Sequence, residues 1–346
     1  MSAPEVVTLG DVARRAGVSL ATASRVLNGS TRRVNEELRT LVHDAASALG
    51  YTPNLHAQAV ARGTSSTVGL IVHDIGDPYF SAIASGVMRV ADDRGLIVTL
   101  GTTSRNPNRE VQYVAMMRAQ RARAVILAGS RVADREQTER LSAEVTAFRR
   151  GGGRVAAVSQ QKLPTDTVLP ENRAGARELA TRLAELGHRR FGVLAGPRTI
   201  LTARDRLSGF RAGLSDAGLP LDPEAVIEGP FTRDGGYQAA RELLERKLGV
   251  TCVFAVNDVM AVGAMAACRE LGVSVPGDLS MAGFDDIETL RDLVPPLTTV
   301  RLPLEEMGMR AAELALDLEP PDRDRLIRIR GEVVLRESTR KIRSRG

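Results

Sequence analysis

The sequence is poor in aromatic residues and in cysteine. Only 3% of its 346 residues are aromatic and none is tryptophan, so alanine, valine, leucine and isoleucine must fill the core. The two cysteines, Cys252 and Cys268, are too few for a disulfide framework, and together with four histidines they form no metal-binding motif. We therefore expect neither a metal ion nor any other cofactor.

Long apolar segments are also missing. No run approaches the roughly 18 apolar residues that a membrane-spanning helix needs, which excludes a membrane partner of that kind. Residues Met1–Glu5 contain nothing like the apolar part of a secretory signal, so we expect a cytoplasmic protein. With 43% hydrophobic and 26% charged residues, the composition is that of a folded globular protein.

Charge is unevenly spread along the chain. The net charge is +5, and residues 322–346 alone hold nine basic and four acidic residues, so the remainder is close to neutral. A basic terminal segment is usually a solvated end. Charge alone is therefore weak support for a nucleic-acid partner.

The first fifty residues have the pattern of three short helices. Thr8-Leu9-Gly10-Asp11 has the form of a capping box, and Gly17 can supply the left-handed residue that ends the first helix. Ser19 can cap a second helix that stops at Asn28-Gly29, and Asn35 can cap a third. Two short helices joined by a glycine-containing turn are typical of a helix-turn-helix motif, although an ordinary three-helix bundle also fits.

The second of these helices carries side chains suited to DNA. In a helix-turn-helix motif it lies in the major groove, and its early residues reach the base edges. Small side chains between Ser19 and Leu27 permit a close approach. Thr22 and Ser24 can bind phosphates, and Arg25 can bind guanine through two parallel hydrogen bonds.

From Val68 onward, short apolar runs alternate with amphipathic helices. The runs lack the apolar–polar alternation of half-exposed strands, which predicts strands buried on both faces. Repeated strand–helix units predict doubly wound parallel α/β sheets, and seven units favour two lobes over one. The seven runs are Val68–Val72, Ile97–Leu100, Ala124–Ala128, Val155–Val158, Phe191–Ala195, Cys252–Val256 and Leu279–Phe284.

Several sequence blocks, taken in order, carry more information than any single motif. The head contains Thr8-Leu9-x-Asp11-Val12-Ala13-x-x-Ala16-Gly17-Val18-Ser19-x-x-Thr22-x-Ser24-Arg25-Val26-Leu27-Asn28. Further blocks include Asp77-Pro78-Tyr79-Phe80, Ala203-Arg204-Asp205-Arg206, Ala255-Val256-Asn257-Asp258 and Gly283-Phe284-Asp285-Asp286. Over nearly its whole length, the chain closely resembles the lactose-repressor (LacI/GalR) family of bacterial transcription regulators.

The resemblance implies an all-α helix-turn-helix head and a two-lobed α/β core like that of periplasmic binding proteins. It implies a dimeric regulator, most often a repressor, whose partners are a near-palindromic double-stranded DNA operator, a second copy of the chain and a sugar-like or nucleoside effector in the cleft. The expected divisions are 1–53 for the head, 54–65 for a hinge helix and linker, 66–168 with 298–322 for the first lobe, and 169–297 with 323–346 for the second.

The resemblance also assigns roles to individual residues. The residues expected to contact DNA are Thr8, Ser19, Leu20, Ala21, Thr22, Ser24, Arg25, Asn28, Asn54, Ala57 and Val60. The residues expected to contact the effector are Tyr79, Phe80, Ser159, Thr202, Arg204, Arg206, Phe231, Asn257 and Asp285. The second set combines cations, aromatic faces, an amide and a carboxylate. Such a mixture suits a neutral polyhydroxylated ligand, because the carboxylate would repel a polyanion.

Each effector assignment has a structural alternative. Arg206 could belong to an ion-pair strip with its neighbours, and Phe231 could be part of the core. Asp258 and Asp286 are better explained as helix caps or structural hydrogen-bonding groups than as ligand contacts.

Other functions are also open at this level. An enzyme has little support, because the chain lacks a G-x-G-x-x-G after a strand, a P-loop, a G-x-S-x-G and an H-E-x-x-H. A solute-binding protein would share the fold of the core but would not need the head. A regulator that answers to a protein partner, or binds DNA constitutively, fits the same sequence.

Overall fold

The computed structural model describes residues 7–27, 34–52, 65–317, 319 and 323–342. By its internal contacts the chain divides into a head, Met1–Ser66, and a core, Thr67–Gly346. Within the described ranges, no helix has the length and apolar character needed to cross a membrane.

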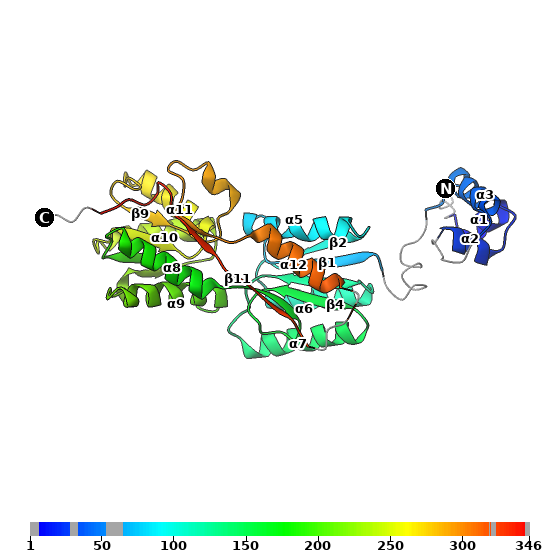
Figure 1. Ribbon diagram of the computed structural model, residues 1–346, viewed down its shortest axis with the longest axis horizontal. Helices are drawn as coiled ribbons and strands as arrows, with labels where there is room; N and C mark the ends of the chain where they lie inside the picture. Colours follow the sequence, from blue (N-terminus) through cyan, green and yellow to red (C-terminus); the bar gives the residue numbers. More distant parts are fainter. Residues whose placement is uncertain (1–6, 28–33, 53–64, 318, 320–322, 343–346) are drawn as a thin grey trace, which may run out of the picture. The chain divides into compact units, whose positions relative to one another are not determined.

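The head is built from the three expected helices, α1 (Leu9–Arg15), α2 (Leu20–Leu27) and α3 (Glu36–Ala48) (Figure 1). Its small core is made of alanine and valine side chains from all three helices. The predicted start of α1 is confirmed, because Thr8 and Asp11 form a full capping box. The turn before α2 is confirmed as well, since Gly17 has a φ of 67°.

The first lobe is a six-stranded parallel sheet in the order β11-β5-β4-β3-β1-β2. Helices α5 and α12 pack together on one face, and α6 and α7 pack together on the other. Every residue of β3 is buried, as its unbroken apolar run predicts. The elements are β1 (Thr67–Val72), α5 (Pro78–Asp92), β2 (Ile97–Thr102), α6 (Pro107–Ala119), β3 (Ala124–Ala128), α7 (Arg135–Arg150), β4 (Arg154–Val158), β5 (Asp166–Pro170), α12 (Leu304–Leu316) and β11 (Leu326–Ile329).

The second lobe is a four-stranded parallel sheet in the order β7-β6-β8-β9. Helices α8 and α9 pack as one pair and α10 and α11 as another. A short antiparallel pair, β10 with β12, continues this lobe, because Thr298 bridges to Ala282 of β9. The elements are α8 (Asn172–Glu185), β6 (Phe191–Ala195), α9 (Leu201–Asp216), β7 (Val226–Glu228), α10 (Arg233–Glu245), β8 (Cys252–Ala255), α11 (Asp258–Glu270), β9 (Ser280–Ala282), β10 (Thr299–Arg301), β12 (Glu332–Val334) and two 3-10 turns, Pro223–Ala225 and Glu288–Arg291.

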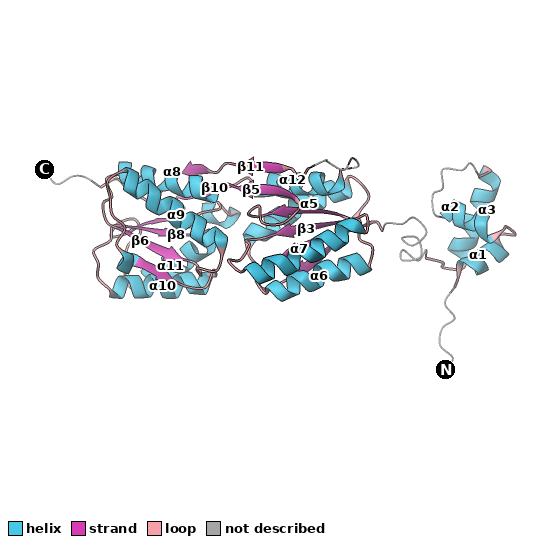
Figure 2. Ribbon diagram, turned by 90° about the horizontal axis from the view of Figure 1, so that it is seen from below, coloured by secondary structure: helices cyan, strands magenta, loops and turns pink. Residues whose placement is uncertain are grey.

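All seven predicted strands are present, and the two-lobed α/β architecture is confirmed. The chain passes between the lobes three times: after β5, between β10 and α12, and between β11 and β12. These crossings correct the expected boundaries at 298 and 323. β10 belongs to the second lobe, whereas residues 298–322 were all expected in the first. Strand β11 pairs with β5 in the first lobe, whereas residues 323–346 were all expected in the second. Figure 2 shows β11 and β5 side by side.

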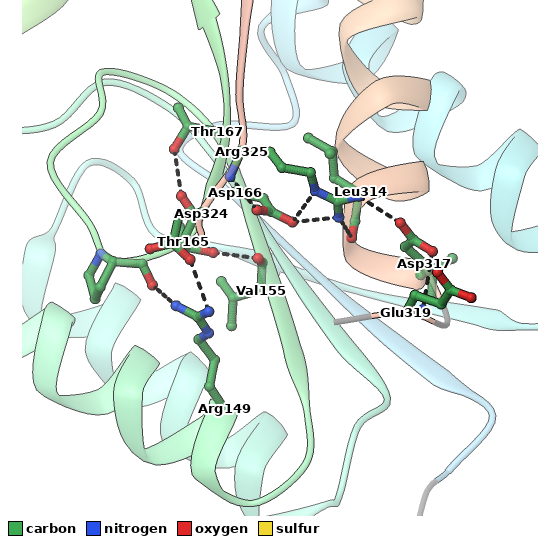
Figure 3. Close-up of polar contacts among 12 residues, drawn as sticks. Arg149, Val155, Thr165, Asp166, Thr167, Leu314, Asp317, Glu319, Asp324 and Arg325 are labelled. Atoms are coloured by element: carbon green, nitrogen blue, oxygen red, sulfur yellow. Dashed lines mark hydrogen bonds and ion pairs between the residues drawn. The ribbon is translucent and has the colours of Figure 1, made fainter. Parts of the chain in front are cut away.

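Arg325 explains why β11 belongs to the first lobe. Its guanidinium contacts both Asp166 at the start of β5 and Asp317 at the end of α12, at 2.7 and 2.6 Å (Figure 3). It also donates to the carbonyl of Leu314, which is one of the otherwise unpaired carbonyls at the end of α12. Arg325 therefore ties one helix and two strands of the first lobe together.

Candidate effector cavity and DNA-binding face

A cavity of about 290 Å³ lies between the two lobes of the core. Its walls come mainly from the loops that follow β1, β2 and β3 in the first lobe and β6 and β7 in the second. These are the carboxyl ends of parallel strands, where open α/β sheets place their ligands. Seven of the nine expected effector residues line the cavity: Tyr79, Phe80, Thr202, Arg206, Phe231, Asn257 and Asp285.

Two expected effector residues lie elsewhere. Ser159 is buried but does not line the cavity, and its hydroxyl donates to the carbonyl of Gln160. Arg204 is exposed on α9 and does not line the cavity either. Arg204 and Arg206 are two positions apart on one helix, so their side chains point in different directions. The structure thus corrects the placement of both residues.

Arg206 and Asp285 form a buried ion pair at the second-lobe wall. The two guanidinium nitrogens lie 2.6 and 3.2 Å from the two carboxylate oxygens. Arg206 also donates to the side chain of Asn172 and to the carbonyl of Val256, both at 2.8 Å, and it stacks over the ring of Phe284. The guanidinium is only 2% exposed, so its position is fixed before any ligand binds.

Asp285 sits in an unusual local environment. Its backbone φ is 126°, a region that residues other than glycine rarely adopt, and such strain is concentrated at functional sites. Burial raises the pKa of Asp285 to about 6, although Arg206 acts in the opposite direction. The carboxylate therefore depends on Arg206 to stay ionised near neutral pH.

The neighbouring residues Asn257 and Asp258 have different roles. Asn257 lines the cavity and also caps α11, because its side-chain oxygen accepts from the backbone of Met260 at 3.0 Å. Asp258 is fully buried and accepts from the hydroxyl of Thr299 and the backbone of Ile287. The prediction of a structural hydrogen-bonding role for Asp258 is confirmed.

Aromatic rings supply part of the apolar lining of the cavity. Tyr79 and Phe80, at the start of α5, contact each other edge to face. On the opposite lobe, Phe231 lies beneath the guanidinium of Arg105, which is 5.5 Å from the ring centre. Flat rings facing a cavity can bind the apolar face of a sugar or a base.

The first-lobe wall contains polar groups that the sequence did not single out. His73, Asp77, Arg105, Glu110, Ser130 and Arg131 all line the cavity. Except for Glu110, each lies shortly after the end of β1, β2 or β3. The rule that ligands bind at the carboxyl ends of parallel strands would have found these residues.

A backbone clasp joins the two lobes at one side of the cavity. Val132 and Ile200 form an antiparallel bridge. The amide of Ala133 donates to the carbonyl of Thr199 at 2.8 Å, and the amide of Leu201 donates to the carbonyl of Arg131 at 3.0 Å. We call these residues, 131–133 and 199–201, the clasp. Because they cover part of the cavity, the lobes must move apart there for the cavity to open on that side.

Two side chains reinforce the clasp. Gln160 accepts from the amide of Arg131 and donates to the hydroxyl of Thr202, both at 2.9 Å, so one amide group contacts both lobes. Ser130 accepts from the amide of Thr202 at 3.0 Å. Gln160 is therefore a structural residue at the edge of the cavity that the sequence did not reveal.

His73 holds the loop that leads into the clasp. Its Nε2 lies 3.1 Å from the carbonyl of Ser130 and its Nδ1 3.1 Å from the hydroxyl of Thr103, so the neutral ring donates to Ser130 and accepts from Thr103. Burial lowers the pKa of His73 to about 4. The imidazole is neutral at neutral pH.

The pKa of His73 predicts a loss of stability in acid. The unfolded chain takes up a proton near pH 6.5 and the folded one only near pH 4, so His73 lowers the free energy of unfolding as the pH falls through that interval. We expect His73→Gln to lose less stability than the parent between pH 7 and pH 5, measured by urea unfolding. His43→Gln, at an exposed position of α3, is the matched control. Equal losses in His73→Gln and the parent would contradict the assignment.

The head presents one face of α2 to solvent. Ala23 is buried, and Val26 and Leu27 pack against the core of the head. Ala21 and Arg25 are exposed on the face of α2 opposite Ala23. Ser19 and Leu20, at the start of α2, are exposed as well, Leu20 by 57%.

Of the remaining expected DNA contacts, Ser24 is half-buried on α2, and the others fall into two groups. Thr8, Ser19 and Thr22 take part in helix capping, because Thr8 belongs to the capping box and the hydroxyl of Ser19 accepts from Thr22. Asn28, Asn54, Ala57 and Val60 lie outside the described residues.

The described ranges contain no cluster of three or more histidine, cysteine or carboxylate side chains placed to hold a metal ion. Both cysteines are buried and unpaired with each other.

Comparison with known proteins decides the family. Residues 8–54 match the model of the bacterial regulatory proteins of the lacI family, and residues 180–339 match a periplasmic binding protein-like domain. The chain is 37% identical over 325 residues to the HTH-type transcriptional regulator GalR of Escherichia coli K12, covering 90% of this chain and 89% of GalR. The chain is a member of the lacI family.

Solved structures of lacI-family proteins share both of its parts. The lac repressor dimer bound to operator and the anti-inducer ONPF is 28% identical, with a TM-score of 0.83 over 97% of this chain and all of that one. The complex of the transcriptional regulator CelR with cellobiose is 31% identical, with a TM-score of 0.69 over 96% of this chain and 99% of that one. The protein is thus a DNA-binding transcriptional regulator with an effector-binding core, and its family is one of regulators rather than enzymes.

Proposed function

We propose that this lacI-family protein is a repressor that binds a near-palindromic operator as a homodimer and responds to a neutral, polyhydroxylated effector of the sugar or nucleoside class. The exposed face of α2 would read the DNA bases, and the cavity between the lobes would hold the effector. As a transcriptional regulator that binds DNA, it would act in the cytoplasm. The complex of CelR with cellobiose and the operator-bound lac repressor dimer support this proposal by analogy.

The paired charges of the cavity are the main observation in favour of a neutral effector. Three arginines line it, and each is paired with one carboxylate: Arg206 with Asp285, Arg131 with Glu110, and Arg105 with Asp77 at 2.6, 2.7 and 3.9 Å. The charges therefore cancel. A phosphate group would be repelled by the carboxylates of these pairs, whereas hydroxyl groups can hydrogen-bond to both members of a pair.

A ligand screen tests the proposal. We expect neutral sugars or nucleosides to raise the melting temperature of the protein, and the corresponding sugar phosphates to raise it less. At 100 times its Kd a ligand stabilises the folded state by about 2.7 kcal/mol. The compound that stabilises the protein should also change the affinity for an operator obtained by selection from random DNA. Stabilisation by anionic compounds alone, or a selected site without two-fold symmetry, would contradict the proposal.

The clasp predicts that removing one of its hydrogen bonds makes it easier for the lobes to separate. Leu201 is the first residue of α9 and follows an extended residue, Ile200, so proline is tolerated there. Leu201→Pro deletes the amide that donates to Arg131 and leaves the cavity side chains in place. One hydrogen bond is worth about 0.5–1.5 kcal/mol, so the effector should dissociate roughly 2 to 12 times faster.

The control for this variant is Arg135→Pro, which places proline at the first position of α7 and leaves the clasp intact. Effector dissociation is measured by stopped flow, and the separation of the lobes by X-ray scattering without effector. Unchanged dissociation and scattering in Leu201→Pro would show that the clasp does not hold the lobes together.

A further inference from the structure

The ion pair between Glu110 and Arg131 is buried in the first-lobe wall of the cavity. Glu110 comes from α6 and Arg131 from the loop after β3, and both side chains are more than nine-tenths buried. The two guanidinium nitrogens lie 2.7 and 2.9 Å from the two carboxylate oxygens. A buried pair of this kind contributes little net stability, because removing two charges from water offsets most of their attraction.

Arg131 has hydrogen-bonding capacity that its surroundings do not use. A guanidinium has five N–H groups, and Arg131 makes three hydrogen bonds, two to Glu110 and one to the carbonyl of Gly129. Its Nε has no partner among the described residues, and neither has the buried Oε1 of Gln137, which lines the same cavity. Arg206 makes four hydrogen bonds with its five N–H groups.

Unpaired buried polar atoms are rare in folded proteins and call for an explanation, such as a bound water or ligand. Here the unpaired donor and the unpaired acceptor belong to two residues that line the same cavity. A hydroxyl group is the chemical group that satisfies both, because it accepts from one atom and donates to another.

We propose that Glu110 and Arg131, with Gln137 beside them, form a second hydroxyl-binding pair that selects among neutral polyols. This inference rests on the proposed function, and it adds the part of the effector that the first lobe recognises. The pair Arg206–Asp285 binds hydroxyls from the second lobe, and the pair Glu110–Arg131 binds a hydroxyl at the other end of the ligand. A ligand held by both pairs contacts both lobes.

The test replaces the whole pair, because removing one member alone would leave an uncompensated buried charge. Glu110→Leu combined with Arg131→Met keeps similar volume and removes every polar atom of the pair. The probes are D-galactose, D-glucose, D-ribose and cellobiose, and the mono-deoxy derivatives of whichever sugar binds the parent protein, with affinities measured by calorimetry.

We expect one deoxy derivative to bind the parent protein about 10 to 100 times more weakly than the intact sugar, as loss of a hydrogen bond to a charged group predicts. In the double variant this discrimination should disappear at that one hydroxyl and remain at the others. Arg177→Met with Asp216→Leu removes an exposed arginine–carboxylate ion pair outside the cavity and should leave all affinities unchanged.

The outcomes separate this inference from the proposed function. If a sugar binds and the double variant keeps the affinity and the deoxy-sugar preferences of the parent, the Glu110–Arg131 pair is structural only and the inference is wrong. A uniform loss over all derivatives also contradicts it. If no probe binds the parent, the sugar-responsive function itself fails. Should the double variant not fold, Arg131→Lys retains the charge but loses the Nε donor, and the same loss of discrimination is expected.

Discussion

Asp285→Asn should raise the effector concentration needed for a response by at least about tenfold, while the protein still binds its operator. The substitution keeps the volume of the side chain but removes the charge that Arg206 contacts through two hydrogen bonds. Hydrogen bonds to charged groups are worth about 1.5–3 kcal/mol each, so loss of the acceptor should weaken effector binding by at least about tenfold. The asparagine side chain also replaces one acceptor oxygen with an NH2 donor next to the guanidinium of Arg206, which further weakens effector binding.

The measurement is operator affinity with and without the effector found by the ligand screen. Because an effector shifts the protein only through its different affinities for two arrangements of the lobes, a variant that binds it more weakly shows the same shift only at a correspondingly higher effector concentration. Breaking a buried pair also lowers stability by about 3–5 kcal/mol, so both proteins are compared well below their melting temperatures. Asp216→Asn, at an exposed ion pair, is the control. A response equal to that of the parent would place the effector elsewhere.

The sequence predicted most of the strands that are buried on both faces, because an unbroken apolar run such as that of β3 leaves few other structures. For β2 the predicted burial was wrong, since it is an edge strand whose Ile97 is 57% exposed. The sequence analysis missed the buried strand β5, and it also missed four short strands. β7, β10 and β12 have three residues each, and β11 exposes Arg328, so none has an apolar pattern long enough to recognise. Their pairing is set by contacts far along the chain, such as that of β11 with β5, and no local signal carries that information.

The site shows the same division. Residues that follow the family pattern, such as Arg206 and Phe231, were placed correctly at the cavity. Arg204 was not, because residues two positions apart on a helix lie on different faces, so Arg204 and Arg206 could not both point into the cavity. The ion pairs of the cavity could not be predicted from the sequence, since Arg206 and Asp285 are 79 positions apart and only the folded sheets bring them together. For Arg206, the expected alternative of an ion-pair strip with its sequence neighbours is wrong, because Arg206 forms its ion pair with Asp285, which also lines the cavity.

Arg25→Ala should change which DNA sequence the protein prefers, besides weakening binding. Arg25 lies on the exposed face of α2, in a head whose helices and caps match the expected helix-turn-helix. An arginine that binds guanine through two hydrogen bonds contributes about 1–3 kcal/mol of discrimination at one base pair. Its loss should therefore make one position of each half-site tolerant of all four bases. The preference is measured by selection from random DNA followed by sequencing.

Arg39→Ala separates sequence reading from simple loss of charge. Arg39 is an exposed arginine of α3, so its removal takes away the same charge from a different helix. Neither a phosphate contact nor the general electrostatic attraction to DNA depends on the base sequence. Arg39→Ala should therefore weaken binding to all DNA sequences about equally or leave it unchanged. If Arg25→Ala selects the same operator as the parent protein and weakens every sequence alike, Arg25 binds the DNA backbone and another residue of α2 reads the base.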